Sequence, residues 1–289
     1  MLRIKTLFVT LLMFGTIISY SQDYHFGIRA GLNYATFQGP VEEGVVETND
    51  LNNGFHFGIV GMMRFNDYFA LGAEILYNQY GTNYLYEGES YYKFNVGEVD
   101  FLYENVKLNL DVSNSYINVP IQIHFNPIKK LEFVAGAYFG FLVSPVAGGR
   151  LEFGSKFYQN LEYNYYSDKA GSVPFGSKTI NVLVPQPDGS DEITQIAKTA
   201  GAYYQYNTDQ FNSDTGSYYN WFDLGVTGGI QYFINSSLYA GVKVEYGFLD
   251  VTNDKLDRSL KAVDEEGNFI LRDDHDTNLN FQISLGFRF

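Results

Sequence analysis

Charged side chains recur singly inside otherwise apolar, glycine-rich segments, and this spacing is the sequence's first indication of chemistry. Unpaired charge is costly away from water, so charged residues that share one enclosed interior should form ion pairs. The pattern therefore predicts a charge-matched interior network, and a proton or ion path is the alternative use of the same residues. The four cations and four carboxylates are Arg29, Arg64, Lys243 and Arg288, with Glu74, Glu132, Asp223 and Glu245.

Histidines are the other candidates for catalysis, and the chain has four of them: His25, His56, His124 and His275. A hydrolytic site needs a nucleophile, a base and an orienting group that converge at one place. The first three histidines fall on the polar faces of alternating segments, and His275 lies in an acidic segment. We expect His124 and His275 at opposite ends of the fold, as satisfied polar groups. An enzyme acting on lipid or peptide at a rim is the competing hypothesis.

Carboxylates also cluster between residues 250 and 276, at Asp250 and Asp254, at 264–266 and at 273–276. Such clusters can hold Ca²⁺ or bridge lipopolysaccharide phosphates through divalent cations. The twelve-residue spacing of an EF-hand is missing, so a solvated acidic loop without metal is the favoured interpretation. The sequence contains no Cys and no glycine-rich phosphate loop between a strand and a helix. Disulfides and thiolate metal sites are therefore excluded, and no cofactor is predicted.

The elements that must position these residues show a two-residue period. In 278–289 the odd positions are all apolar and the even positions are polar, glycine or Arg288. Strict alternation with one wholly apolar face suits a strand between hydrocarbon and a polar interior. No charged residue falls on the apolar faces. The eight alternating segments are 24–37, 55–65, 69–78, 116–125, 131–144, 222–232, 238–248 and 278–289.

The connections between these segments are sharply unequal in length. Three are tight turns, near Asn66, Pro127 and Ser236, and four are long loops. Alternating short and long connections are typical of outer-membrane β-barrels, with periplasmic turns and extracellular loops. We therefore predict an all-β, antiparallel up-and-down barrel of eight strands with both termini in the periplasm. The long loops, at about 38–53, 81–114, 145–220 and 250–276, carry net charges of −4, −4, −3 and −5.

Two stretches within the 145–220 loop offer an alternative topology. Residues 178–184 and 202–206 could be hairpin arms, and a barrel that used them would have ten strands. Their faces are too polar for contact with lipid, which favours eight.

The N-terminus has the features of a secretory signal peptide. Arg3 and Lys5 precede an apolar run that is too short for a membrane helix, and a small-residue site follows. We predict cleavage after Ser21, so that the mature domain is 22–289 and begins with Gln22. The formal charge of −14 then becomes −16. Nucleic acid is not an expected partner, because phosphate contacts need clustered Lys and Arg.

A barrel of eight strands has an interior that side chains can fill. We therefore predict a plugged lumen rather than a diffusion channel, although a narrow solute channel remains an alternative. The predicted function is structural, adhesive or accessory binding through the acidic extracellular loops. No enzymatic activity is predicted.

Several segments resemble the PorT-like outer-membrane β-barrel family, in order along nearly the whole mature chain. The resemblance implies a small outer-membrane barrel of Gram-negative bacteria with no enzymatic signature, in contact with membrane lipid and lipopolysaccharide. Phe287 and Phe289 also resemble the aromatic end that the barrel-assembly machinery recognises. The long 145–220 loop departs from the family, and the secretion role of its eponymous member does not transfer on fold alone. The matching segments are 71–81, 116–123, 136–142, 222–229, 246–250 and 283–289.

Overall fold

Strands make up almost all of the described chain. A computed structural model describes residues 23–96, 99–165, 179–186, 188–197 and 217–289. The predicted signal peptide and the 202–206 arm lie outside these residues. The strands are β1 (Asp23–Gln38), β2 (Val46–Arg64), β3 (Phe69–Val96), β4 (Val99–Ile128), β5 (Leu131–Phe153), β6 (Phe157–Asn164), β7 (Thr179–Pro185), β8 (Asp191–Ala197), β9 (Phe222–Phe233), β10 (Leu238–Gly247), β11 (Arg258–Val263), β12 (Phe269–Leu271) and β13 (Thr277–Arg288).

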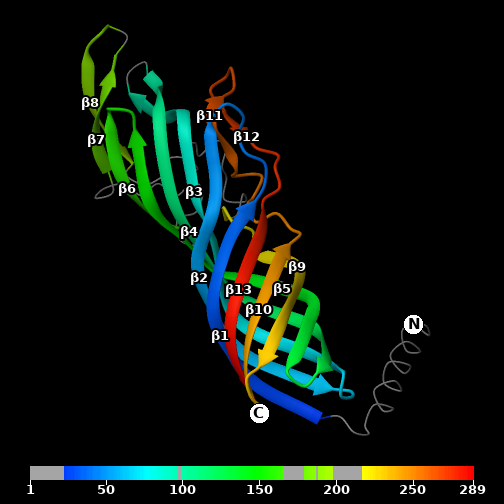
Figure 1. Ribbon diagram of the computed structural model, residues 1–289. Coiled ribbons are helices and arrows are strands. Elements are labelled where there is room, and N and C mark those ends of the chain that lie inside the picture. The colour runs from blue at the N-terminus through cyan, green and yellow to red at the C-terminus, as the bar shows by residue number, and fades with distance from the viewer. Residues whose placement is uncertain (1–22, 97–98, 166–178, 187, 198–216) are drawn as a thin grey trace, which may run out of the picture.

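Eight of these strands close into an antiparallel ring, which confirms the predicted barrel (Figure 1). The ring runs β1-β2-β3-β4-β5-β9-β10-β13 and returns to β1. The backbone N–H of Phe289 donates to the carbonyl oxygen of Phe26 at 2.8 Å, where the first and last strands meet. Within the described residues β7 pairs only with β8, in a separate two-stranded sheet. The ten-strand alternative is therefore wrong.

The ring keeps the predicted faces. On β13 the side chain of Ile283 is 55% exposed on the outside, whereas Gln282 is 1% exposed on the inside. The same alternation runs around the ring, with apolar residues outward and mainly polar residues or glycine inward; Val60, Leu76 and Val134 are apolar residues that point inward. Pairing of β3 with β4 is interrupted between Ala73↔Ile121 and Leu76↔Asn118, opposite Pro120. This open position is expected, because proline has no N–H to donate.

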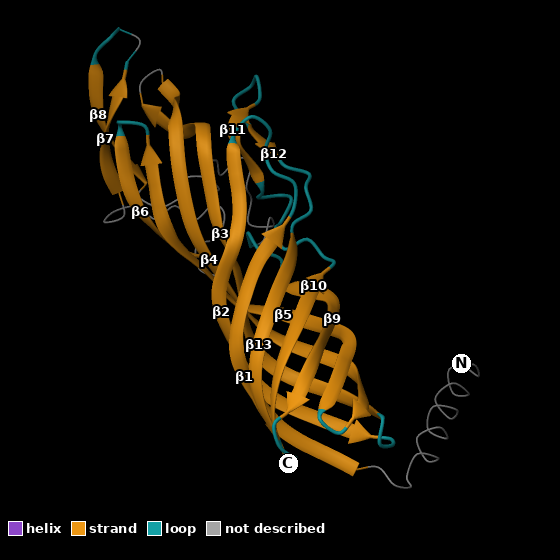
Figure 2. Ribbon diagram, viewed as in Figure 1, coloured by secondary structure: helices purple, strands orange, loops and turns teal. Residues whose placement is uncertain are grey.

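The connections at the two ends of the ring differ strongly, as predicted. Tight turns join the strands at the end where β1 begins and β13 ends, which we call the termini end (Figure 2). At the opposite, distal end β2, β3, β4 and β5 continue far beyond the ring. The predicted loops 38–53 and 81–114 are therefore largely strand, and the 145–220 loop begins with the end of β5 and with β6. The loop prediction was wrong for these stretches.

The extended strands form a distal sheet in which the polarity of the two faces is reversed. On β4, Ile121 and Ile123 point outward within the ring, and Gln122 points inward. Beyond Ser115 the inward positions become apolar, as at Leu108 and Val112, and the outward ones become polar. The distal sheet is therefore patterned like a soluble sheet, with an apolar inner face and a polar outer face.

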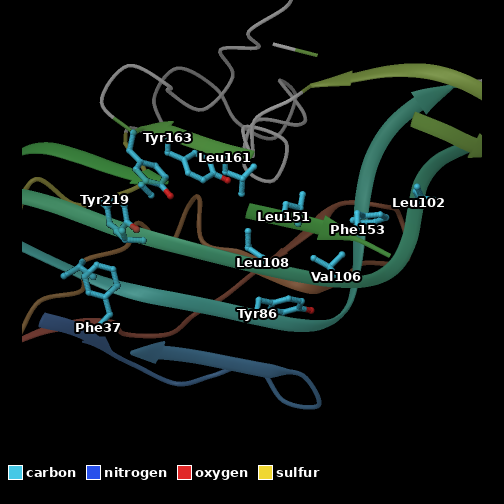
Figure 3. Packing of buried hydrophobic residues seen from close by; sticks show 14 of the residues in the cluster. Phe37, Tyr86, Leu102, Val106, Leu108, Leu151, Phe153, Leu161, Tyr163 and Tyr219 are labelled. Carbon is cyan, nitrogen blue, oxygen red and sulfur yellow. The ribbon is translucent and has the colours of Figure 1, made fainter. Parts of the chain in front are cut away.

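The inner face of the distal sheet supports a hydrophobic core above the ring. Figure 3 shows its aromatic and aliphatic side chains converging from several strands. The core also takes in Tyr219 and Val251, from the segments before β9 and after β10. The hairpin of β11 and β12 packs beside it, with Leu256 and Phe269 buried against Tyr91. Among the described residues, no helix is long and apolar enough to cross a membrane.

Candidate functional site

The lumen holds most of the predicted charge network, and its centre is Glu74. Lys243 Nζ lies 2.7 Å from Glu74 Oε1, and an Arg29 guanidinium nitrogen lies 3.0 Å from Glu74 Oε2. Lys243 also donates to Gln122, and Arg29 donates to Gln282. All of these side chains are at most 3% exposed. Strands β1, β3 and β10 thus place two cations on one carboxylate inside the ring.

A second cluster lies nearer the termini end, around Glu132. Arg288 makes two hydrogen bonds of 2.9 Å to the two oxygens of Glu132. His124 Nδ1 lies 2.7 Å from Glu132 Oε1. A bidentate arginine–carboxylate pair is the strongest common ion-pair geometry. This cluster therefore ties β4, β5 and β13 together across the lumen.

The prediction that all eight charges pair with one another was wrong for three of them. Asp223 accepts hydrogen bonds from Tyr138 and Asn278. Glu245 accepts hydrogen bonds from Tyr80, Asn78, Asn280 and Gln282. Neutral donors can satisfy a buried carboxylate without a cation. Arg64 is partly exposed near the termini end and makes no ion pair among the described residues.

The histidines do not converge on one place. His56 bonds to Asn33 and Ser284 inside the lumen, and His25 is half-buried at the start of β1. His124 belongs to the Glu132 cluster, and His275 lies exposed at the distal end, against the carbonyl oxygen of Phe248. The expected separation of His124 from His275 is thus confirmed.

A cavity of about 110 Å³ lies at the distal end, and sequence reasoning missed it. Its walls come from the inner face of the distal sheet, from Tyr218 and Tyr219 and from the segment that contains β11 and β12. Arg272 crosses one side, with a guanidinium nitrogen 2.7 Å from Glu47 and another 2.6 Å from Asp274. Tyr84 donates to Glu47 at 2.8 Å. The pairs join β2 and β3 to the last long loop.

Three carboxylates of the predicted acidic loop meet beside Arg272. Oxygen atoms of Asp257, Asp274 and Asp276 lie within 4.8 Å of one another. Asp257 is 7% exposed, and the side chain of Asp274 is 8% exposed. The expectation of a solvated loop was therefore wrong at this point, because β11 and β12 fold the segment back on itself. Such a group of oxygens could hold a cation.

Proton binding at these carboxylates should control the stability of the distal end. Burial, and then the neighbouring Asp274, raises the pKa of Asp257 to about 8. Burial and Asp274 likewise raise the pKa of Asp276 to about 7. Each folded pKa exceeds the unfolded value of about 4, so the folded state holds these protons more tightly. The resulting stability is present in acid and is lost as the pH rises from about 4 to about 8.

We predict that hydrogen-exchange protection of the β11 amides falls between about pH 4 and about pH 8, after correction for the intrinsic rate. Asp257 titrates while it faces Arg272, Asp274 and Asp276. In Asp257→Asn the fall should become smaller, because only Asp276 then still ionises in this range. The Glu265→Gln variant, altered at an exposed carboxylate of the same loop, should behave as wild type. Protection that stays constant with pH in wild type would contradict the assignment.

The ring and its faces together define a class of protein. A closed ring with no free strand edge, apolar outside and polar inside, is a membrane-spanning β-barrel. The family model named outer membrane protein beta-barrel domain matches residues 20–253, which is most of the chain. The chain belongs to this family, and the family places it in the outer membrane. The narrower resemblance to PorT-like proteins stays a prediction.

Solved structures of small outer-membrane proteins are similar to this chain at low identity. The attachment invasion locus protein Ail of Yersinia pestis is 11% identical, with a TM-score of 0.35, over 92% of this chain and 99% of Ail. Neisserial surface protein A is 10% identical, with a TM-score of 0.39, over 93% and 99%. OprG of Pseudomonas aeruginosa is 11% identical, with a TM-score of 0.38, over 93% and 97%. No curated protein matches the sequence.

Proposed function

We propose that the barrel is a closed anchor in the outer membrane of a Gram-negative cell. Its distal sheet would stand outside the cell and act as an adhesive or accessory binding module. Both termini would lie in the periplasm after removal of residues 1–21. The barrel-assembly machinery would recognise the end of β13, where Phe287 and Phe289 are exposed. Membrane lipid and lipopolysaccharide would surround the ring.

The network inside the lumen is the observation that carries this proposal. Glu132 and Glu74 occupy successive levels of the barrel, with Asp223 and Glu245 nearer the distal end. Each is at most 2% exposed and accepts hydrogen bonds from residues on other strands. A lumen crossed at several levels by bonded side chains leaves little room for a solute. The distal sheet and the segments packed on it are then the part of the protein that is available to bind a partner or ligand.

The lengths and charges of the connections support the proposed orientation. Short turns close the termini end, and short turns are periplasmic in bacterial outer-membrane barrels. The distal segments carry the acidity of the chain, whereas the remaining mature residues sum to zero net charge. Acidic groups at the cell surface could also meet lipopolysaccharide through bridging divalent cations.

Conductance of the purified protein in planar bilayers tests the closed lumen. We expect a flat current at the noise level under conditions in which a reconstituted porin gives stable open steps. Stable steps of porin size from this protein would overturn the proposal in favour of a channel.

Labelling of intact cells tests the orientation separately. The sequence contains no Cys, so single cysteines report their own position. Ser190 lies exposed between β7 and β8, and Ser236 lies exposed in the turn before β10. A membrane-impermeant maleimide should label Ser190→Cys on intact cells and should label Ser236→Cys only after lysis. The reverse pattern would place the distal sheet in the periplasm.

An enzyme acting at a rim is the competing proposal, and we favour a binding protein over it. The side chain of His124 is fully buried and held by Glu132, so it offers no free base to a substrate at the rim. His275 remains accessible at the distal end. Loss of a hydrolytic activity in His275→Ala, with the heat-modifiability of the barrel unchanged, would favour the enzyme.

A further inference from the structure

The distal cavity has a wall of tyrosine rings. Tyr165, Tyr218 and Tyr219 line it and contact one another, with ring centroids 4.9–5.4 Å apart. The ring planes of Tyr218 and Tyr219 are nearly perpendicular, at 87°. Burial holds the pKa of both phenols well above the usual value, so both rings stay neutral. Neutral aromatic rings set at right angles are the arrangement that encloses organic cations.

The lining of the cavity also has an excess of carboxylates. Glu47, Asp257 and Asp276 line it together with Arg258 and Arg272, and an oxygen of Asp274 lies within 4.8 Å of those of Asp257 and Asp276. Four carboxylates therefore face two guanidinium groups.

Both arginines already have partners. Arg272 is held by Glu47, by Asp274 and by the carbonyl oxygen of Pro40. The guanidinium carbon of Arg258 lies 4.2 Å from the centre of the Phe269 ring. Asp257 and Asp276, in contrast, make no ion pair within the described part of the chain. The charge that the cavity lacks is therefore positive.

The remaining wall limits what can carry that charge. Phe37, Leu108, Leu110 and Val112 add an apolar surface to the lining. A cavity of about 150 Å³ can hold benzene, so a volume of about 110 Å³ suits a short alkyl chain. A bare metal ion would leave the apolar and aromatic walls without a partner.

We propose that the distal cavity binds a small organic ammonium ion, with the ammonium group at Asp257 and Asp276 and a short apolar chain against the tyrosines. This inference gives a ligand class for the proposed binding module. The biological role of the ligand rests on the proposed function. Its chemistry is independent of which way the barrel faces. The ammonium group would take the place of the protons that Asp257 and Asp276 otherwise hold.

Calorimetric titration of the full-length protein in detergent micelles tests the proposal, with n-butylammonium as the probe and empty micelles as the blank. n-Butanol and butyrate keep the same chain and replace the ammonium group by a neutral or a negative one. We expect saturable binding of n-butylammonium, at least about tenfold tighter than binding of either analogue. Binding should also strengthen as the pH rises from about 6 to about 8, because the carboxylates lose their protons.

Variants locate the site and guard against misfolding. Asp257→Asn and Asp276→Asn should each weaken n-butylammonium binding about tenfold or more, since a charge-assisted hydrogen bond becomes a neutral one. The exposed Glu265→Gln should change it less than about twofold. Hydrogen exchange of β11 shows whether each variant keeps the distal fold.

Four results would overturn the proposal. They are equal binding of n-butanol, preferred binding of butyrate, no saturable binding at millimolar concentration, and displacement of the probe by Ca²⁺ at equal affinity in all variants. Reversed labelling of intact cells or porin-like conductance would instead overturn the proposed function and leave this site intact.

Discussion

Replacing Glu74 by alanine should lower the free energy of unfolding by about 3–5 kcal/mol, because it strands two buried cations. Arg29 and Lys243 both pair with this carboxylate, and neither is more than 3% exposed. Among the described residues, Glu245 is linked to Arg29 only through Gln282, which accepts a hydrogen bond from Arg29 and donates one to Glu245. Urea titration of the protein in micelles, followed by loss of the heat-modifiable band, measures the effect.

The exposed pair of Glu87 and Lys107 is the matched control for this measurement. It has a similar nitrogen–oxygen distance, 3.3 Å, but its side chains are 55% and 48% exposed. Glu87→Ala should therefore cost about 0–1 kcal/mol. Equal losses in the two variants would mean that the lumen is wet enough to solvate its charges.

The substitution Ile121→Lys should destabilise the folded barrel by about 2–4 kcal/mol, because Ile121 points outward from the ring into lipid. Its side chain is 45% exposed on β4, and exposure on that face means contact with hydrocarbon. Folding into lipid vesicles, measured as the folded fraction against urea concentration, reports the cost.

The control lies further along the same strand and on the same side. Asn109 also points outward on β4, but within the distal sheet. Asn109→Lys should change stability by less than about 0.5 kcal/mol, since that surface meets water. If both lysines are tolerated equally, the reversal of polarity near Ser115 does not mark the edge of the bilayer.

The ring could be predicted from sequence because lipid imposes a one-sided rule on every spanning strand. An outward position such as Ile283 must be apolar, so alternation shows both the strand and its face. The distal parts of β3 and β4 obey the opposite rule. Tyr84, Tyr86 and Leu108 turn inward there, while glutamate, lysine and asparagine turn outward. If apolar outward positions are required, as in a membrane-spanning strand, these segments resemble polar loops. For this reason they were not predicted as strands from the sequence.

The partners inside the lumen could be predicted only as a group. Alternation places Glu74 and Lys243 on the inner face of the barrel. It does not give their position along the barrel axis or their angular position around it. The height and the angular position of each side chain depend on the stagger between neighbouring strands, which cannot be predicted from the alternation alone. Asp223 has no ion pair among the described residues because two neutral inward-facing residues, Tyr138 and Asn278, donate hydrogen bonds to its carboxylate.

The distal cavity depends on contacts between residues far apart in the chain. Asp257 and Asp276 converge only because β11 and β12 fold their loop over the core, and the pairing of Arg272 with Glu47 spans most of the sequence. The acidic sequence of this loop showed that carboxylates are present. Only the structure shows that some of them are buried.

The closure of the ring by its two outermost strands has a consequence for folding. Neighbouring strands in the sequence from β2 to β5 pair with one another and can form as hairpins. The pairing of β1 with β13, by contrast, joins the two ends of the chain, for example Gly27 with Arg288 and Gln38 with Thr277. Contacts of such long sequence separation form slowly. Until the C-terminal strand arrives, the growing sheet has two open edges that can recruit another chain. A truncated chain without β13 should therefore aggregate rather than insert.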